Sequence, residues 1–397
     1  MGWKGRAMLI RNLRLIDGAG DIRDGVDVLI RGGRFAEIGP GLDGYGEEVD
    51  AGGATAIPGL IDAHTHLTLD ATTRAIENAA TRPHAEQAGE TAGRAAAMLG
   101  LGVTTVREVG GVAELSLGLR DRVASGSASG PRIFSAGAWI TLPDGHGWQV
   151  GLPADDRDSL RRAAHQQLDD GADLLKMMVS GAVLRPDGQP DPQQYSEEEV
   201  AIVTSVAHTE GKRVAAHAHG EPSIRNAVRG GIDTVEHASF VTAELIEEML
   251  ERGTFIVPTL AVIRLVLAIL RGEMLERTAE LADRHHAGIT AAWRAGVPIA
   301  AGTDMGGAPL TGPDTIHAEI EHLTGIGMSN HEAIQAATLQ GARAIGVEDD
   351  LGTVRPGLRA DLLILDGDPL DDIAATRSAR HLLQDGEWRI RDGVQVA

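Results

Sequence analysis

The sequence predicts an α/β protein: a (β/α)8 TIM barrel with a small β-sandwich domain made from both chain termini. Two observations point to this fold class. Between residues 58 and 351, apolar segments alternate with longer stretches of helical pattern, over the length of about 250 residues that is usual for such a barrel. Short alternating segments between turn residues occupy both ends of the chain. We therefore expect residues 1–57 and 352–397 to form the sandwich and residues 58–351 to form the barrel.

The terminal strands are predicted from alternation of apolar and polar residues that stops at Gly or Pro. Near the N-terminus these segments are Leu9–Ile16, Val26–Ile30 and Arg34–Ile38. Near the C-terminus they are Ala360–Asp366, His381–Gly386 and Trp388–Gly393.

Eight apolar segments are predicted as barrel strands: Leu60–Leu67, Val103–Val109, Arg132–Ile140, Asp173–Ser180, Arg213–His219, Thr234–Ser239, Phe255–Val262 and Pro298–Thr303. The clearest helical patterns between and after them are Glu86–Leu99, Ser159–Asp170, Ser196–Glu210, Thr315–Gly325 and Asn330–Ile345. Ser196 followed three residues later by Glu199 has the spacing of a capping box, which marks a helix start.

Composition restricts the partners of the protein. The 397 residues carry 36 basic and 57 acidic side chains, for a formal net charge of −21. Nucleic acids and acidic membranes bind basic surfaces, so we expect neither as a partner. The most apolar stretch, Leu260–Leu270, is interrupted by Arg264 and too short for a membrane span, and Met1–Arg14 lacks the long apolar run expected of a secretory signal. We expect a cytoplasmic protein that takes a small-molecule or short-peptide substrate.

Two histidines at the end of the first predicted barrel strand are the strongest sign of chemistry. His64 and His66 are two residues apart, so in a strand their side chains point to the same face. That face of the strand is turned toward the barrel axis, at the mouth where barrel active sites lie. The chain has no cysteine, so any metal there must be held by nitrogen and oxygen ligands. The alternative is a pair of hydrogen-bonded core histidines.

Further candidate ligands stand at the ends of later strands. Lys176 lies inside the fourth strand, where a lysine is costly unless it is paired or chemically changed, for example to a CO2-derived carbamate. His217 and His237 lie near the C-terminal ends of the fifth and sixth strands, and Asp304 directly follows the eighth. Each has an ordinary explanation alone, such as a barrel-interior histidine, but together with His64 and His66 they predict a metal centre.

These six residues resemble, in order and strand position, the ligands of the amidohydrolase superfamily members that bind two metals. The segments Pro58–His66 and Gly352–Leu362 are similar to the superfamily's entry to the barrel and its return to the sandwich. Lys176–Gly181 and His217–Gly220 resemble the imidazolonepropionase-related branch. That branch contains Xaa-Pro dipeptidase-like and ochratoxin amidase-like enzymes, and many of its members are homo-oligomers.

The resemblance implies two divalent ions, with Zn²⁺ expected, and a role for each ligand. His64, His66 and Asp304 would hold one ion, and His217 and His237 the other. Carboxylated Lys176 and a hydroxide would bridge the two. The hydroxide would attack the amide of a dipeptide, an N-acyl amino acid or an aryl amide, with Asp304 as the catalytic base.

Substrate contacts are predicted on weaker grounds. His146 and Trp148 lie in a Gly-rich loop after the third strand, where peptidase-like relatives bind a substrate carboxylate. His219 stands where relatives often carry Tyr. Arg107 is a possible anion contact, or else the partner of an acid. Tyr195 and the loop 181–194 could form a lid.

Three other functions stay open at this stage. A cyclic-amide or carbamate hydrolase would use the same site. A deaminase on this barrel would use a glutamate after the fifth strand, for which Glu221 is the candidate, although Lys176 argues against it. A non-catalytic scaffold would be expected to lose one or more of the six ligands.

Overall fold

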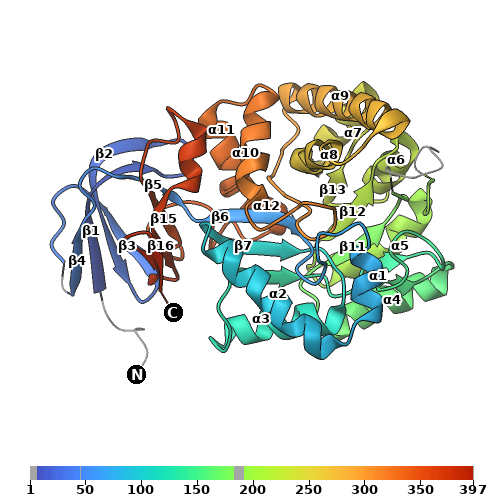
Figure 1. Ribbon diagram of the computed structural model, residues 1–397, viewed down its shortest axis with the longest axis horizontal. Helices are drawn as coiled ribbons and strands as arrows, with labels where there is room; N and C mark the ends of the chain where they lie inside the picture. Colours follow the sequence, from blue (N-terminus) through green and yellow to red (C-terminus); the bar gives the residue numbers. More distant parts are fainter. Residues whose placement is uncertain (1–6, 45, 183–191, 397) are drawn as a thin grey trace.

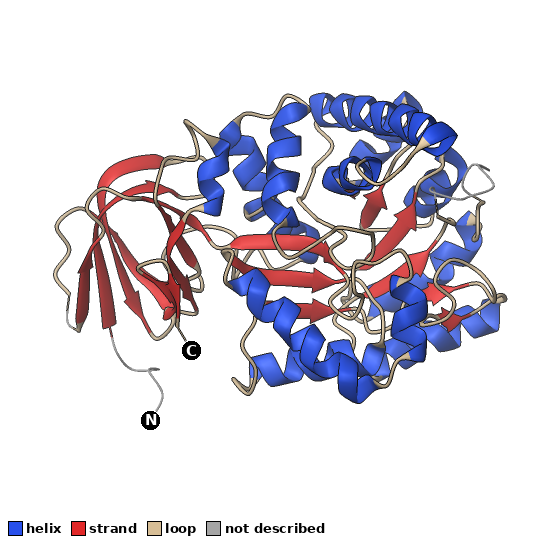
Figure 2. Cartoon of the chain, in the orientation of Figure 1, coloured by secondary structure: helices blue, strands red, loops and turns tan. Residues whose placement is uncertain are grey.

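The two ends of the chain meet in one sheet beside a helix-covered barrel (Figures 1 and 2). The structure is a computed structural model that describes residues 7–44, 46–182 and 192–396. The sheet from the chain ends runs in the order β18-β17-β16-β15-β5-β1-β2-β3, with β4 pairing β1. The N-terminal and C-terminal strands join where β5 pairs antiparallel with β15.

This sheet is formed by β1 (Ala7–Ile16), β2 (Ile22–Arg31), β3 (Arg34–Gly39), β4 (Glu47–Asp50), β5 (Thr55–Pro58), β15 (Leu362–Leu365), β16 (Ala379–Gln384), β17 (Glu387–Arg391) and β18 (Val394–Gln395). Its strands bury one shared apolar core, to which Leu13, Val28, Leu362 and Leu383 contribute. Burial of side chains from both ends in one core is what a sandwich requires, so the predicted terminal sandwich is confirmed.

The barrel strands are parallel and lie in two sheets. One sheet contains β6 (Leu60–Thr65), β7 (Val103–Glu108) and β8 (Arg132–Ser135). The other contains β9 (Ile140–Thr141), β10 (Leu152–Pro153), β11 (Leu175–Met178), β12 (Val214–Ala218), β13 (Thr234–His237) and β14 (Phe255–Val257).

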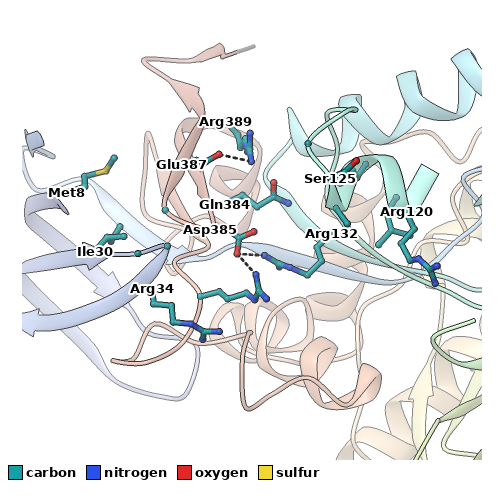
Figure 3. Close-up of a pocket in the computed structure, with 18 of the residues that line it drawn as sticks. Met8, Ile30, Arg34, Arg120, Ser125, Arg132, Gln384, Asp385, Glu387 and Arg389 are labelled. Atoms are coloured by element: carbon teal, nitrogen blue, oxygen red, sulfur yellow. Dashed lines mark hydrogen bonds and ion pairs between the residues drawn. The ribbon is translucent and has the colours of Figure 1, made fainter. Parts of the chain in front are cut away.

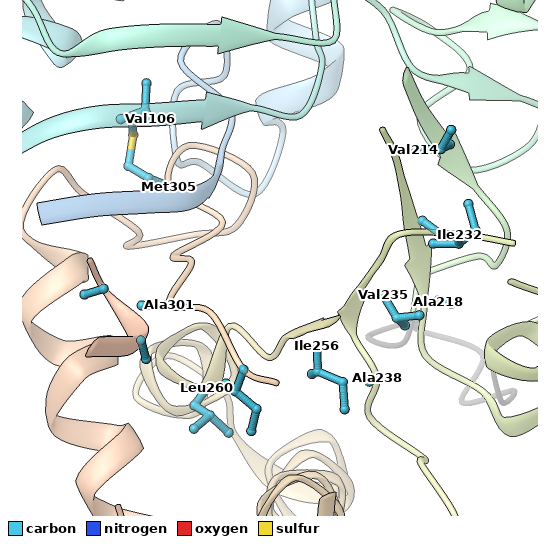
Figure 4. Packing of buried hydrophobic residues seen from close by; sticks show 14 of the residues in the cluster. Val106, Val214, Ala218, Ile232, Val235, Ala238, Ile256, Leu260, Ala301 and Met305 are labelled. Carbon is cyan, nitrogen blue, oxygen red and sulfur yellow. The ribbon is translucent and has the colours of Figure 1, made fainter. Parts of the chain in front are cut away.

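Backbone contacts close the two sheets into a ring. On one side, the Asp173 N–H donates to the Ser135 carbonyl at 2.8 Å. On the other side, residues 298–305 bridge the gap, pairing Ile299 with Ile256 of β14 and Met305 with Thr65 of β6. The buried cluster inside and around this ring is largely aliphatic (Figure 4). The TIM barrel predicted from the sequence is therefore confirmed.

Helices cover the outside of the ring (Figure 2). They are α1 (Ala75–Thr81), α2 (His84–Leu99), α3 (Ala113–Ala124), α4 (Arg157–Asp169), α5 (Glu197–Thr209), α6 (Glu221–Arg229), α7 (Ala243–Arg252), α8 (Leu260–Leu267), α9 (Gly272–Ala295), α10 (Thr315–Gly325), α11 (Asn330–Ala336) and α12 (Leu339–Ile345). The predicted capping box is confirmed, because Ser196 and Glu199 exchange hydrogen bonds at the start of α5. Among the described residues, no helix combines the length and apolar character that crossing a bilayer requires.

Four predicted elements were wrong in part. The third strand ends at Ser135, and the segment predicted as the eighth strand forms only an isolated bridge between Ile299 and Ile256. The other two differ because of contacts that sequence periodicity does not reveal. The seventh strand ends at Val257, and α8 begins at Leu260 instead of extending the strand. The buried Glu319 carboxylate accepts the N–H groups of Leu260 and Ala261 and so caps this helix. The single helix expected over 330–345 is two helices, and the break frees the Ala337 carbonyl to accept the Ile61 N–H at 2.7 Å.

Ion pairs connect the sandwich to the barrel. Arg132 of β8 donates to Asp361 at 2.9 Å and to Asp385 at 2.8 Å. A cavity of about 800 Å³ lies at this junction, lined by Arg34, Gln384 and other polar side chains (Figure 3). No residue that lines it belongs to the histidine clusters described next.

Candidate metal centre

Three of the predicted ligands meet at the mouth of the barrel. His66 Nε2 lies 3.3 Å from His64 Nε2 and 3.2 Å from Asp304 Oδ1. His64 Nε2 lies 3.4 Å from the same carboxylate oxygen. All three side chains are largely or fully buried. The nitrogen and oxygen atoms therefore converge on one point, which is the arrangement a bound divalent cation requires.

A second cluster of three histidines lies next to the first. His237 Nε2 is 3.0 Å from His217 Nδ1, and the His219 ring stacks on the His237 ring at 4.5 Å. The His64 and His237 ring centroids are 5.1 Å apart. Each cluster offers three ligand atoms that lie within 4.8 Å of one another. The structure thus brings the two predicted halves of the centre together, and it adds His219 to the second half.

Hydrogen bonds outside the clusters hold the rings in place. His66 Nδ1 donates to the Gly110 carbonyl at 2.6 Å, and His237 Nδ1 shares a hydrogen bond of 2.8 Å with the Thr259 hydroxyl. His219 Nδ1 does the same with Ser239. Each of these rings uses one nitrogen for a hydrogen bond to the protein and turns the other nitrogen toward its cluster, as metal-binding histidines do.

The backbone at the clusters adopts a conformation that is unusual for residues other than glycine. His237 has a φ of +69°, Asp304 of +53° and Thr259 of +50°. Left-handed backbone at such residues costs on the order of 1–3 kcal/mol each, and it is concentrated at functional sites. The strained backbone lies at the strand ends, where it directs these side chains toward the clusters.

The electrostatics favour neutral imidazoles at His217 and His237 and an ionised carboxylate at Asp304. Burial, reinforced by the neighbouring histidines, holds the pKa of His217 and His237 well below the ordinary imidazole value. Burial alone would raise the pKa of Asp304, but hydrogen bonds and charge from His64 and His66 outweigh it and lower that pKa. Neutral imidazole and carboxylate are the forms that bind metals.

Lys176 lies inside the barrel, and among the described residues its amine has no hydrogen-bond partner. Its side chain is 1% exposed. Burial lowers the pKa of Lys176 to about 8, against the opposing charge of Glu236. An orphaned amine in a barrel interior fits a group that is chemically changed in the working protein. The donor set and this orphan together fit a two-metal centre.

The structure separates the five predicted substrate contacts. His146 is brought to the centre, with its ring centroid 4.7 Å from that of His217, and His219 belongs to the second cluster. Trp148 is 47% exposed on the loop that carries His146. Most of the predicted lid, residues 183–191, lies outside the described residues.

Arg107 and Tyr195 are not placed to contact a substrate. Arg107 is 1% exposed and donates to Glu236 at 2.8 Å, so its partner is neither a ligand anion nor the adjacent Glu108. Tyr195 is fully buried, and its hydroxyl donates to the Ala154 carbonyl at 2.8 Å. Both side chains point into the protein because their polar groups find partners there.

Sequence reasoning missed two residues beside the clusters. Trp139 is buried, its ring lies edge-on to His66 at 5.5 Å, and its Nε1 donates to the Gly147 carbonyl. Glu236 is fully buried and accepts a hydrogen bond from His64. The available signal was a charged residue inside each of two predicted strands, Arg107 and Glu236, since buried charges require partners.

Comparison with known proteins agrees with this geometry. Residues 55–384 match the profile of the Amidohydrolase family. Ochratoxinase from Aspergillus niger is 32% identical over 349 residues, covering 80% of this chain and 71% of its own. A Xaa-Pro dipeptidase crystallised with methionine in its active site superposes with a TM-score of 0.86 at 29% identity, covering 96% of this chain and 99% of its own. The ochratoxinase crystal structure also gives a TM-score of 0.86, at 27% identity, covering 98% of this chain and 97% of its own.

Proposed function

Because this chain belongs to the amidohydrolase family, we propose that it is a metal-dependent hydrolase that cleaves the C–N bond of an amide. The observation that carries the proposal is the pair of adjacent three-donor clusters at the barrel mouth. The ring centroids of His64, in the first cluster, and His237, in the second, are only 5.1 Å apart. Five of the six side chains expected as ligands belong to these clusters.

The residues divide between two ions. His64, His66 and Asp304 would hold one, His217 and His237 the other, and a carboxylated Lys176 would lie between them. Two divalent ions, Zn²⁺ being the expected metal, would supply an activated water at neutral pH and polarise the substrate carbonyl. The histidines would contribute position and no proton chemistry.

Asp304 is the group that moves the proton. Its carboxylate is ionised and lies at the mouth of the barrel. When water adds to the amide carbonyl carbon, one water proton passes to Asp304. Asp304 then delivers that proton to the amide nitrogen as the C–N bond breaks, so the products are a carboxylic acid and an amine.

The substrate class follows from the relatives and from His146. The names of the relatives describe cleavage of ochratoxin and of Xaa-Pro dipeptides, so we propose an N-acyl amino acid, dipeptide or aryl amide. His146 faces the second cluster and would donate a hydrogen bond to the substrate carboxylate. His219 and the exposed Trp148 would border the acyl or aryl group.

A metal-and-substrate experiment tests the proposal. The protein is stripped with chelator and reloaded with Zn²⁺ and bicarbonate, and bound zinc is counted while dipeptides, N-acyl amino acids, aryl amides and cyclic amides are screened. We expect about two ions per chain and cleavage of a linear amide, both abolished by the chelator. Binding of no metal under these conditions contradicts the proposal, and turnover of cyclic amides alone would replace the substrate class.

A further inference from the structure

A network of buried charged side chains contacts His64 of the first cluster. Glu236 of β13 is fully buried, and its Oε2 lies 2.7 Å from His64 Nδ1 of β6. Its Oε1 accepts from Arg107 of β7 at 2.8 Å and from the Thr234 hydroxyl at 2.5 Å. Three strands that are distant in the sequence therefore meet at one carboxylate.

We propose that Glu236, itself locked by Arg107, is the positioning residue that sets the tautomer of His64 and turns its Nε2 toward Asp304 and His66. The inference rests on the proposed function for its significance, since a metal needs the Nε2 lone pair free. It does not follow from the ligand set, because neither Glu236 nor Arg107 belongs to that set.

The hydrogen-bond inventory gives Glu236 one available orientation. Arg107 donates through Nε to the Ala63 carbonyl at 2.5 Å and through Nη1 to Thr234 at 2.8 Å, so its guanidinium is fixed. The ion pair occupies Oε1 and leaves Oε2 for His64. An ionised carboxylate only accepts hydrogen bonds, so Nδ1 of His64 must carry the proton and Nε2 is the free nitrogen.

A purely structural ion pair would not need this second contact. Removing one partner of a buried pair is expensive whatever its role, so loss of stability alone does not identify a positioning residue. The property that separates the two roles is the proton position on His64. That property is measurable without metal, substrate or turnover.

The test uses ¹⁵N NMR of the metal-free full-length protein labelled at histidine, at about pH 8.5, where an ordinary imidazole is neutral. We expect His64 Nδ1 to be protonated in the wild-type protein. In Glu236→Gln, Arg107 and Thr234 still require an acceptor, so the amide nitrogen turns to His64 and the proton moves to Nε2. Zinc affinity should fall by about 10- to 100-fold.

Glu319→Gln is the matched control. Glu319 is also a fully buried carboxylate, but it accepts backbone N–H groups at the start of α8. We expect it to leave the His64 tautomer and the zinc affinity unchanged. Arg107→Lys keeps the positive charge but loses the planar guanidinium that donates to three groups at once. It should weaken zinc binding less than Glu236→Gln does.

Each outcome decides the inference. An unprotonated Nδ1 in the wild-type protein overturns it even if no variant folds. A folded Glu236→Gln protein with the wild-type tautomer and zinc affinity also overturns it. If the wild-type protein binds no zinc, the proposed function fails, whereas the tautomer measurement still decides whether Glu236 positions His64.

Discussion

Asp304 Oδ1 lies 3.2 Å from His66 Nε2, although the two residues belong to the last and first strand segments of the barrel. The contact exists because residues 298–305 close the ring against β6, with the Asp304 N–H donating to the His64 carbonyl at 2.8 Å. Ring closure therefore places a carboxylate beside two imidazoles.

Asp304→Asn should leave the fold intact and lower amide hydrolysis by orders of magnitude. Asparagine keeps the shape of the side chain and its backbone hydrogen bonds, but it cannot accept and return a proton. The check is kcat together with zinc content and the circular dichroism spectrum. Turnover near the wild-type rate would remove Asp304 as the base.

Lys176→Ala should reduce bound zinc, and among the described residues it leaves no hydrogen-bond partner of the amine unsatisfied. If the working group is a carbamate, acetate or formate added to the variant should partly restore metal and activity. Metal analysis and activity with and without these acids are the measurements. Wild-type metal content without rescue would count against a carboxylated lysine.

His146→Ala should raise KM for substrates with a free carboxylate by about tenfold, the usual value of one hydrogen bond to a charged group. Burial lowers the pKa of His146 to about 4, so the ring acts as a neutral N–H donor and the effect should persist from pH 6 to 8. Matched amides without the carboxylate serve as the control. An equal rise in KM for both substrates would refute the role.

Gly151→Ala should destabilise the loop that carries His146. A Cβ at residue 151 would lie 2.6 Å from the ring of Trp139, which is buried and cannot move away, and such overpacking typically costs about 1–3 kcal/mol. Gly89→Ala in α2 is the control, since its Cβ would meet no atom within 4 Å. Urea unfolding of both variants measures the difference, and equal free energies of unfolding would disprove the clash.

Stability should fall with rising pH partly because of Glu319. Burial raises its pKa from 4.5 to about 8 in the folded protein, against the opposing backbone hydrogen bonds. Between these values the folded state holds a proton that the unfolded state has lost, so the stabilisation present at low pH is lost as pH rises to about 8. Glu319→Gln should therefore flatten the pH dependence of the free energy of unfolding, by up to about 1.4 kcal/mol per pH unit. Parallel curves for the variant and the wild type would contradict this.

Local pattern was sufficient for the fold class and for the convergence of His64 and His66. A strand with His64 and His66 two residues apart must point both rings to one face, and parallel strands must present their ends at one mouth. The capping box at Ser196 likewise needed no tertiary information. These features depend on covalent spacing, which the sequence states directly.

Tertiary contacts alone decided the remaining features. Phe255–Val262 is largely apolar, and its second half is a helix whose first N–H groups donate to the distant Glu319 carboxyl group. Arg107 suggested an anion contact until β13 supplied Glu236 as its partner. In both cases a buried charge found its counterpart far along the chain. Spacing along a strand determines the direction of a side chain, but its partner depends on which distant segment the closed barrel brings within hydrogen-bonding distance.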